Sequence, residues 1–287
     1  MNMKRSVILI VGGLALTQGA LAQHSVWTAG FIYGTNVGNP GVNDTIASGA
    51  SAEGSRSYTG LDRSGATQTM TFSGKTINSS TYGRLRSYST ATLENSYYNE
   101  SNPFAWDNAA NASNPNGSPD AVAALGFAGF TDTLQFGGSL QSGYRARYLF
   151  HVDGTNSGVG YLADMAVNIA GNNESFFAFS PGFSSQIWAT NSYEINGITP
   201  QEISVQFSTQ AVFNTWEYAD GSNLAGTADF SSTLTLVGIE VQDANGNVVP
   251  TGWTVTSASG TQYPTVPEPA TLTVLGLGAL ALRRRKK

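Results

Sequence analysis

The sequence predicts an all-β protein: a β-sandwich or jelly-roll-like body with long Gly/Ser/Asn-rich loops, followed by a short C-terminal hydrophobic helix. Three observations predict this class. Apolar and polar residues alternate with a period of two through most of the chain. Gly occurs 33 times in 287 residues and separates the short alternating segments. Charged residues make up only 11% of the chain, so the Lys and Glu that favour helices are scarce.

Composition also excludes several classes of function. The chain has no cysteine, which excludes disulfides, zinc–thiolate sites and thiol nucleophiles. Its formal net charge is −5. Seven of the basic residues lie at the two ends, and without these ends the body keeps seven basic and 18 acidic residues, a net charge of −11. We therefore expect no nucleic-acid partner, because such a partner needs a basic face.

Residues 1–22 have the pattern of a secretory signal peptide. Lys4 and Arg5 precede an apolar run at residues 7–16, which is too short to span a hydrocarbon layer of ~30 Å. Ala20 and Ala22 form an A-x-A site for signal peptidase, with Gln23 as the mature start. An uncleaved anchor or a buried helix is the alternative.

The body, residues 23–262, reads as short strands in order. In the segment 144–152 one face is apolar and the strand should end at the turn Asp153-Gly154; the apolar positions are Tyr144, Ala146, Tyr148, Phe150 and Val152. Residues 203–207 form a second strand through Ile203, Val205 and Phe207. Further strands are expected within residues 67–74, 83–94, 130–138, 174–182 and 185–197.

Near the end of the body the pattern predicts strand, turn and strand. Leu234 and Leu236 are followed by Ile239 and Val241, and Asn245-Gly246 marks the reversal. Residues 36–65 and 99–119 read as long loops, and residues 120–124 as a weak helical segment. Short strands at such spacing favour a sandwich or jelly roll.

The C-terminal segment, residues 263–287, has three parts. Pro267 and Pro269 flank Glu268 and keep the chain extended. Residues 271–282 are apolar and would form a helix of about 18 Å, short of a full membrane span. A basic stop-transfer cluster then closes the chain: Arg283, Arg284, Arg285, Lys286 and Lys287.

The Pro267-Glu268-Pro269 sequence, the apolar stretch and the basic cluster together resemble the PEP-CTERM sorting signal of Gram-negative bacteria. This resemblance implies that exosortase, an inner-membrane enzyme, recognises the tail and removes it. The protein would be held transiently at the inner membrane and would then reach the cell surface or extracellular matrix, where exopolysaccharide is a partner. A simple tail anchor is the alternative.

The body offers little chemistry for catalysis. His151 is the one histidine away from the cleavage site, and no H-E-x-x-H, G-x-S-x-G or phosphate-loop motif occurs. The acidic pairs Glu217/Asp220 and Asp229/Glu240 would serve a glycosidase only if they lay ~5–10 Å apart in a groove. We therefore expect a non-enzymatic structural protein of the surface or matrix.

A carbohydrate-binding, lectin-like module is the alternative function. Trp106, Tyr97 and Tyr98 are the candidate glycan contacts, because they fall in loop-like sequence where aromatic rings can stack on sugars. Calcium would suit the oxygen-rich turns that begin at Asp153, Asp220 and Asp243, although Asp, Asn and Gly favour such turns for backbone reasons alone. No cofactor is otherwise expected, and the sequence identifies no metal site.

Overall fold

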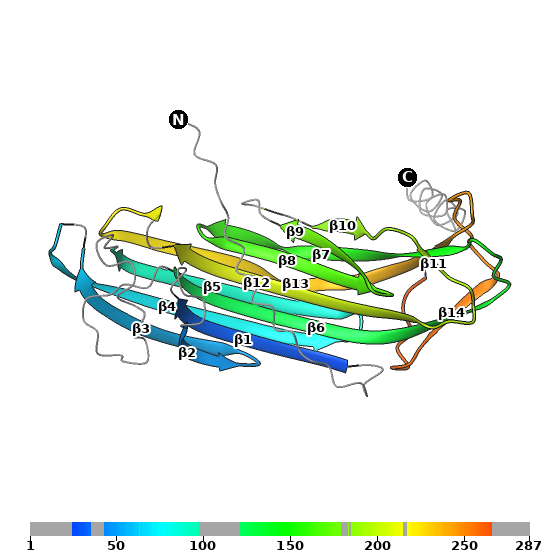
Figure 1. Ribbon diagram of the computed structural model, residues 1–287, viewed down its shortest axis with the longest axis horizontal. Coiled ribbons are helices and arrows are strands. Elements are labelled where there is room, and N and C mark those ends of the chain that lie inside the picture. Colours follow the sequence, from blue (N-terminus) through cyan, green and yellow to red (C-terminus); the bar gives the residue numbers. More distant parts are fainter. Residues whose placement is uncertain are drawn as a thin grey trace, which may run out of the picture.

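The computed structural model describes residues 25–35, 43–62, 64–97, 121–178, 183, 185–214 and 217–265. These residues form two β-sheets that face each other, with most strands running along the long axis of the molecule (Figure 1). All pairings between named strands are antiparallel. The described part of the chain is therefore all-β and sandwich-like, and it holds no helix long and apolar enough to cross a membrane.

The first sheet has β6 and β12 at its centre. Its strand order is β2 (Asn43–Gly49), β1 (Ser25–Thr35), β6 (Ala121–Gly138), β12 (Gln201–Asn214), β8 (Tyr161–Ile169) and β9 (Asn172–Ala178). The short strand β14 (Trp253–Ser257) pairs with the last residues of β6.

The second sheet is built around the longest strand, β13. Its order is β10 (Gln186–Ala189), β7 (Arg145–Gly158), β13 (Ser222–Gln242), β5 (Arg84–Ser96), β4 (Thr67–Thr81) and β3 (Ala52–Leu61). The two-residue strand β11 (Tyr193–Glu194) pairs with the start of β7.

The predicted alternation on β7 is confirmed, but the predicted end of this strand is wrong. Ala146, Tyr148, Phe150 and Val152 are all fully buried. The strand does not turn at Asp153-Gly154 and continues to Gly158. A Cβ at Gly154 would lie 2.4 Å from the ring of Phe230, so this glycine gives the ring room to pack against a continuing strand.

A bulge in β13 explains why its buried positions change parity. Leu234, Leu236, Ile239 and Val241 are all buried, although two are even-numbered and two odd. The pairing of β13 with β7 shifts register between Leu236 and Gly238, and the extra residue, Val237, is 37% exposed. The reversal at Asn245-Gly246 is confirmed by a backbone hydrogen bond from Asp243 to Asn247.

Two other sequence expectations are wrong. Residues 36–65 were expected to be loops, but they include β2 and β3. In β3 Ala52 and Tyr58 turn apolar side chains into the core, and Gly and Ser hide the alternation. Residues 121–124 begin β6 and are not helical, because they pair with both β1 and β12. The expected loop 99–119 and the C-terminal helix lie outside the described residues.

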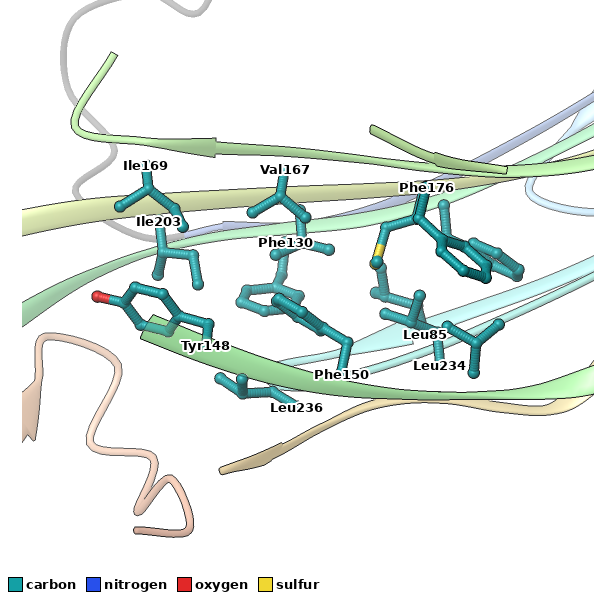
Figure 2. Packing of buried hydrophobic residues seen from close by; sticks show 14 of the residues in the cluster. Leu85, Phe130, Tyr148, Phe150, Val167, Ile169, Phe176, Ile203, Leu234 and Leu236 are labelled. Carbon is teal, nitrogen blue, oxygen red and sulfur yellow. The ribbon is translucent and has the colours of Figure 1, made fainter. Parts of the chain in front are cut away.

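The core has two apolar clusters. The larger cluster fills the sandwich between β6, β8 and β12 on one side and β7 and β13 on the other, and its residues interdigitate (Figure 2). Phe207 and Phe230 from opposite sheets meet edge to face with ring centroids 5.4 Å apart. The smaller cluster contains Phe72, Leu93 and Phe213 together with Tyr58 and Tyr97.

A band of buried polar side chains separates these clusters. Ser87 and Ser89 of β5 hydrogen-bond to Thr209 Oγ1 of β12 at 2.7 and 2.8 Å. Ser87 also donates to Asn78 Oδ1 at 2.7 Å, and Asn78 Nδ2 donates to the carbonyls of Ala29 and Ala50. The polar band therefore satisfies its own hydrogen-bonding groups and ties the two sheets together.

Candidate functional site

The body ends in a fixed structure just before the predicted sorting signal. After β14 the chain turns back so that Tyr263 packs against the larger cluster, where it is 7% exposed. Its ring lies on Gly83, whose φ is +74° and where a Cβ would come within 3.0 Å of the ring. Glycine at position 83 thus serves both the turn between β4 and β5 and the close approach of Tyr263.

Asp132 holds this turn by hydrogen bonds to both of its carboxylate oxygens. Asp132 lies fully buried on the inner face of β6. Its Oδ1 accepts from the backbone N of Thr133 at 2.8 Å and of Ser259 at 3.1 Å. Its Oδ2 accepts from Ser259 Oγ at 2.6 Å and from the Tyr263 hydroxyl at 2.7 Å. Four donors compensate the cost of burying this polar group.

The phenol of Tyr263 remains a donor across the physiological range. Burial raises its pKa above the usual 10, and the hydrogen bond to Asp132 raises the pKa further. Both effects oppose ionisation, because a phenolate would be desolvated and would face a carboxylate. The Tyr263 hydroxyl therefore keeps its hydrogen bond to Asp132 at neutral pH.

Pro264 and Thr265 extend the second sheet. Ile239 N donates to the carbonyl of Pro264 at 2.9 Å, and Thr265 forms a parallel bridge with Ile239. They lie beyond the end of the β5–β13 ladder, whose last pair is Arg84 with Thr235. The packed body therefore reaches Thr265, three residues past the boundary at 262 that the sequence suggested.

Sequence reasoning missed this junction, which we define as Asp132, Ser259, Tyr263 and Thr265. One signal was available, since Asp132 has the same parity as Phe130 and Leu134 in a strand-like segment. A period of two places all three on one face, so a buried carboxylate with partners was implied. The partners themselves are 127 and 131 residues away in the chain.

The other predicted residues of the two ends lie outside the described residues. They are the signal-cleavage residues Ala20 and Ala22, the sorting residues Pro267, Glu268 and Pro269, and the basic cluster of residues 283–287.

The prediction that Tyr97 contacts a glycan is wrong. Tyr97 directly follows β5 and is fully buried in the smaller cluster. Burial raises the pKa of its hydroxyl to about 12, and this hydroxyl has no hydrogen-bond partner within the described part of the chain. A ring in this position has no face available to a sugar. Tyr98 and Trp106 lie outside the described residues.

The turn at Asp220 comes to lie beside Tyr97. Gly221 N donates to Ser96 O at 2.7 Å, and Asn223 Oδ1 accepts from Asn95 N at 2.9 Å. These contacts border an open hollow of about 540 Å³ on the surface, with Glu94 on its rim. Asn223 uses its carbonyl oxygen within the fold, so the turn is held by protein groups.

The turn at Asp243 has a similar explanation. Asp243 Oδ1 accepts from the backbone N of Asn245 at 2.8 Å and of Asn247 at 2.9 Å. Hydrogen bonds from Asn247 lower the pKa of this carboxyl. Among the described residues, no group of three or more His, Asp or Glu side chains is placed to hold a metal ion.

The three tryptophans in the described ranges pack on the protein itself. Trp27 lies over Gly129, where a Cβ would be 2.3 Å from the indole. Trp188 packs on Phe150 at 5.9 Å and Trp253 on Phe136 at 6.4 Å, measured between ring centroids. All three are half-buried.

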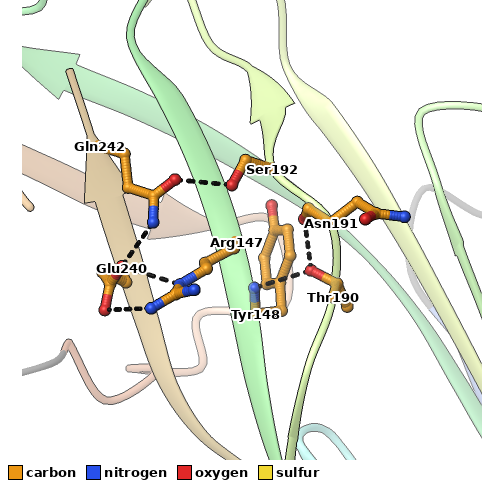
Figure 3. A network of polar contacts seen from close by, with 7 residues as sticks. All are labelled: Arg147, Tyr148, Thr190, Asn191, Ser192, Glu240 and Gln242. Atoms are coloured by element: carbon orange, nitrogen blue, oxygen red, sulfur yellow. Dashed lines mark hydrogen bonds and ion pairs between the residues drawn. The ribbon is translucent and has the colours of Figure 1, made fainter. Parts of the chain in front are cut away.

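The candidate acidic pair Asp229/Glu240 does not converge. Both residues lie on β13, eleven positions apart, which is ~36 Å along a strand. Glu240 forms a two-point ion pair with Arg147, at 2.8 and 3.1 Å, and also accepts from Gln242 at 2.9 Å (Figure 3). His151 hydrogen-bonds to Ser185 Oγ. Each of these groups has a structural partner.

Comparisons with known proteins bear on the tail. Residues 265–287 match the PEP-CTERM protein-sorting motif. No curated protein matches the chain. Among solved structures, a PA14 sugar-binding domain from an RTX adhesin is similar over 82% of this chain and 97% of that domain, with 9% identity and a TM-score of 0.22. A likeness at that TM-score carries no argument about the body. The chain therefore ends in a PEP-CTERM protein-sorting motif, which implies export, a transient membrane stage and processing by exosortase.

Proposed function

We propose that the protein is a non-enzymatic structural component of the cell surface or extracellular matrix, handed over at the inner membrane when its tail is removed. In this proposal signal peptidase cleaves after Ala22 and exosortase acts at Pro267-Glu268-Pro269. The apolar run and the basic cluster hold the chain only until then.

The observation that carries this proposal is where the packed body ends relative to the motif. Every described strand and the whole Asp132–Tyr263 junction precede Val266. Within the part of the chain that the structure describes, cleavage at the motif would therefore break no strand pairing and remove no core residue. An exported domain without cysteine must rely on such packing and hydrogen bonds for its stability.

The lectin-like alternative loses one of its three candidate contacts, because Tyr97 is buried. Calcium loses support as well, because Asp243 is engaged in its own turn. A matrix role needs no dedicated pocket. A large sandwich with many surface hydroxyl groups is suited to it.

Mass spectrometry of the mature C-terminus tests the proposal in a host that has exosortase. We expect surface or matrix protein to lack residues 283–287. Replacing Pro267, Glu268 and Pro269 by Ala should leave a longer form in the membrane fraction. The matched control, Thr271→Ala with Thr273→Ala, changes the same tail but leaves the motif intact and should be processed normally. Recovery of surface-released protein with its basic cluster intact would contradict the proposal.

A further inference from the structure

Basic side chains are confined to one of the two sheets. The strands of the first sheet contain no Lys or Arg. The strands of the second sheet carry six, namely Arg56, Lys75, Arg84, Arg86, Arg145 and Arg147. In a body with a net charge of −11, such segregation makes the outer face of the second sheet distinct.

Three of these residues, Arg84, Arg86 and Arg145, are exposed and make no ion pair within the described ranges, and the first two lie together. Lys75 pairs with Glu53 at 2.7 Å, and Arg147 pairs with Glu240. Arg84 and Arg86 lie on the outer face of β5, since Leu85 and Ser87 between and after them point into the core. Two guanidinium groups on one face of a strand, about 7 Å apart at their Cα atoms, are thus available to an external partner.

The nearest carboxylate on the adjoining strand is already engaged. Asp229 of β13 lies opposite Tyr88, and its Oδ1 accepts from Ser231 Oγ at 2.6 Å and from Ser231 N at 3.1 Å. Its hydrogen bonds are local to β13 and do not involve either arginine.

Hydroxyl groups and one apolar cross-strand pair surround the two arginines. On β4, Ser79 lies opposite Arg86 and Thr81 opposite Arg84, and both are exposed. One pair further along, Ile77 lies opposite Tyr88, and Ile77 is 49% exposed. We define these six residues, Ile77, Ser79, Thr81, Arg84, Arg86 and Tyr88, as the arginine strip.

We propose that the arginine strip binds an anionic polysaccharide whose sugars carry carboxylate groups. Arg presents a planar fork of donors that matches a carboxylate in two-point contact. Exposed Ser and Thr hydroxyls can exchange hydrogen bonds with sugar hydroxyls, and the Ile77–Tyr88 pair offers an apolar surface to the face of a sugar ring. This inference rests on the proposed function, because the body would meet such a polymer only after export.

A nucleic-acid partner fits the same strip less well. Phosphate-directed binding gains affinity from many contacts at once, and the strip offers two free cations on a strongly negative body. A polymer with sparser charge and abundant hydroxyls matches its chemistry better. Single-stranded DNA is therefore a comparison ligand in the test.

Binding of the full-length chain in mild detergent to immobilised polygalacturonate tests the proposal. Neutral dextran and single-stranded poly(dA) are the comparison polymers. We expect polygalacturonate to bind more tightly than both, with an affinity that falls as salt rises. Arg84→Gln with Arg86→Gln should weaken that binding about tenfold, and Tyr88→Ala should weaken it about threefold.

Arg145→Gln is the matched control. Arg145 is exposed on β7 of the same sheet. It lies six residues, or ~20 Å along the strand, from His151, the residue of β7 at the level of the arginine strip. Its replacement should therefore leave binding unchanged. Circular dichroism and the unfolding temperature check that each variant is folded. Equal losses in the double variant and the control, equal binding of poly(dA), or no binding by the wild-type chain would each overturn the proposal. Removal of the tail, read by mass spectrometry, should be unaffected by the double variant, which separates this test from that of the proposed function.

Discussion

The two apolar clusters of the sandwich differ in their aromatic contacts and in what closes their edges. The larger cluster has aromatic contacts across the sheets, including Phe207 with Phe230, and is closed at the tail end by the Asp132–Tyr263 hydrogen bond. The smaller cluster relies on Phe72, Phe213 and two tyrosines. In the smaller cluster the Tyr97 hydroxyl has no hydrogen-bond partner within the described residues.

Three long strands, β5, β6 and β12, turn small or hydroxyl-bearing residues inward where they pass between the two clusters. On β6 the inner face runs from Ala124 through Gly126 to Ala128, and on β12 from Ala211 through Thr209 to Phe207. On β5, Ser89 and Ser87 lie between Ala91 and Leu85. Small and hydroxyl-bearing residues at this level exchange apolar burial for hydrogen bonds between the sheets. The polar band therefore connects the larger and the smaller apolar cluster.

The largest effect should come from deleting one ring in each cluster. Phe150→Ala should lower the free energy of unfolding by about 4–5 kcal/mol, because the cavity also removes the contact with Trp188. Phe72→Ala should cost about 3 kcal/mol. Urea denaturation followed by fluorescence and circular dichroism measures both values.

If the polar band couples the clusters, both variants should still unfold in a single transition with coincident probes. Two separate transitions in Phe72→Ala would show that the smaller cluster unfolds on its own and that the band does not couple the halves.

A smaller effect is expected from crowding the band itself. In Gly126→Ala the new Cβ would lie 2.5 Å from Asn78 Oδ1 and 2.7 Å from Ser87 Oγ, so the hydrogen bonds of the band must shift. We expect a loss of about 2–3 kcal/mol in unfolding free energy. The matched control on the same strand is Gly137→Ala, where the nearest atom is the side-chain Oγ1 of Thr254 at 3.1 Å. Its loss of unfolding free energy should stay under ~1 kcal/mol. Equal losses would mean that the band has room to spare.

The contrast between the clusters also explains how far the sequence predicts the fold. Strands through the larger cluster carry large apolar residues at every second position, as on β7 and at Ile203, Val205 and Phe207, and these were predicted correctly. Strands through the band and the smaller cluster turn small residues inward, so the apolar alternation is hidden in β3 and at the start of β6, where the sequence predicts loop and helix. The sorting motif was predictable because its signal is local. The Asp132 junction was not, because its partners come from a segment more than 120 residues away.

The smallest effect compares one tyrosine hydroxyl from each cluster. Tyr263→Phe removes a donor to the buried Asp132 carboxylate and should cost about 1.5 kcal/mol at pH 7. Tyr97→Phe removes a hydroxyl without a partner and should be neutral or slightly stabilising. Urea denaturation at pH 7 measures this difference, and equal costs would contradict the assignment of the two hydroxyls.

Alkaline pH sharpens the same comparison. Burial raises the pKa of both tyrosines above the usual 10, to about 12 for Tyr97, and at Tyr263 the hydrogen bond to Asp132 raises the pKa further. A raised pKa in the folded state means that the stabilising contribution is complete below pH 10 and is lost as pH rises through the folded pKa. Between pH 10 and 11 each wild-type tyrosine should therefore lower the unfolding free energy by up to about 1.4 kcal/mol per pH unit, because the unfolded chain ionises first. Either Phe variant should flatten this decline by about that amount. A decline between pH 10 and 11 that stays unchanged in Tyr263→Phe would show that this phenol is not held protonated by the junction.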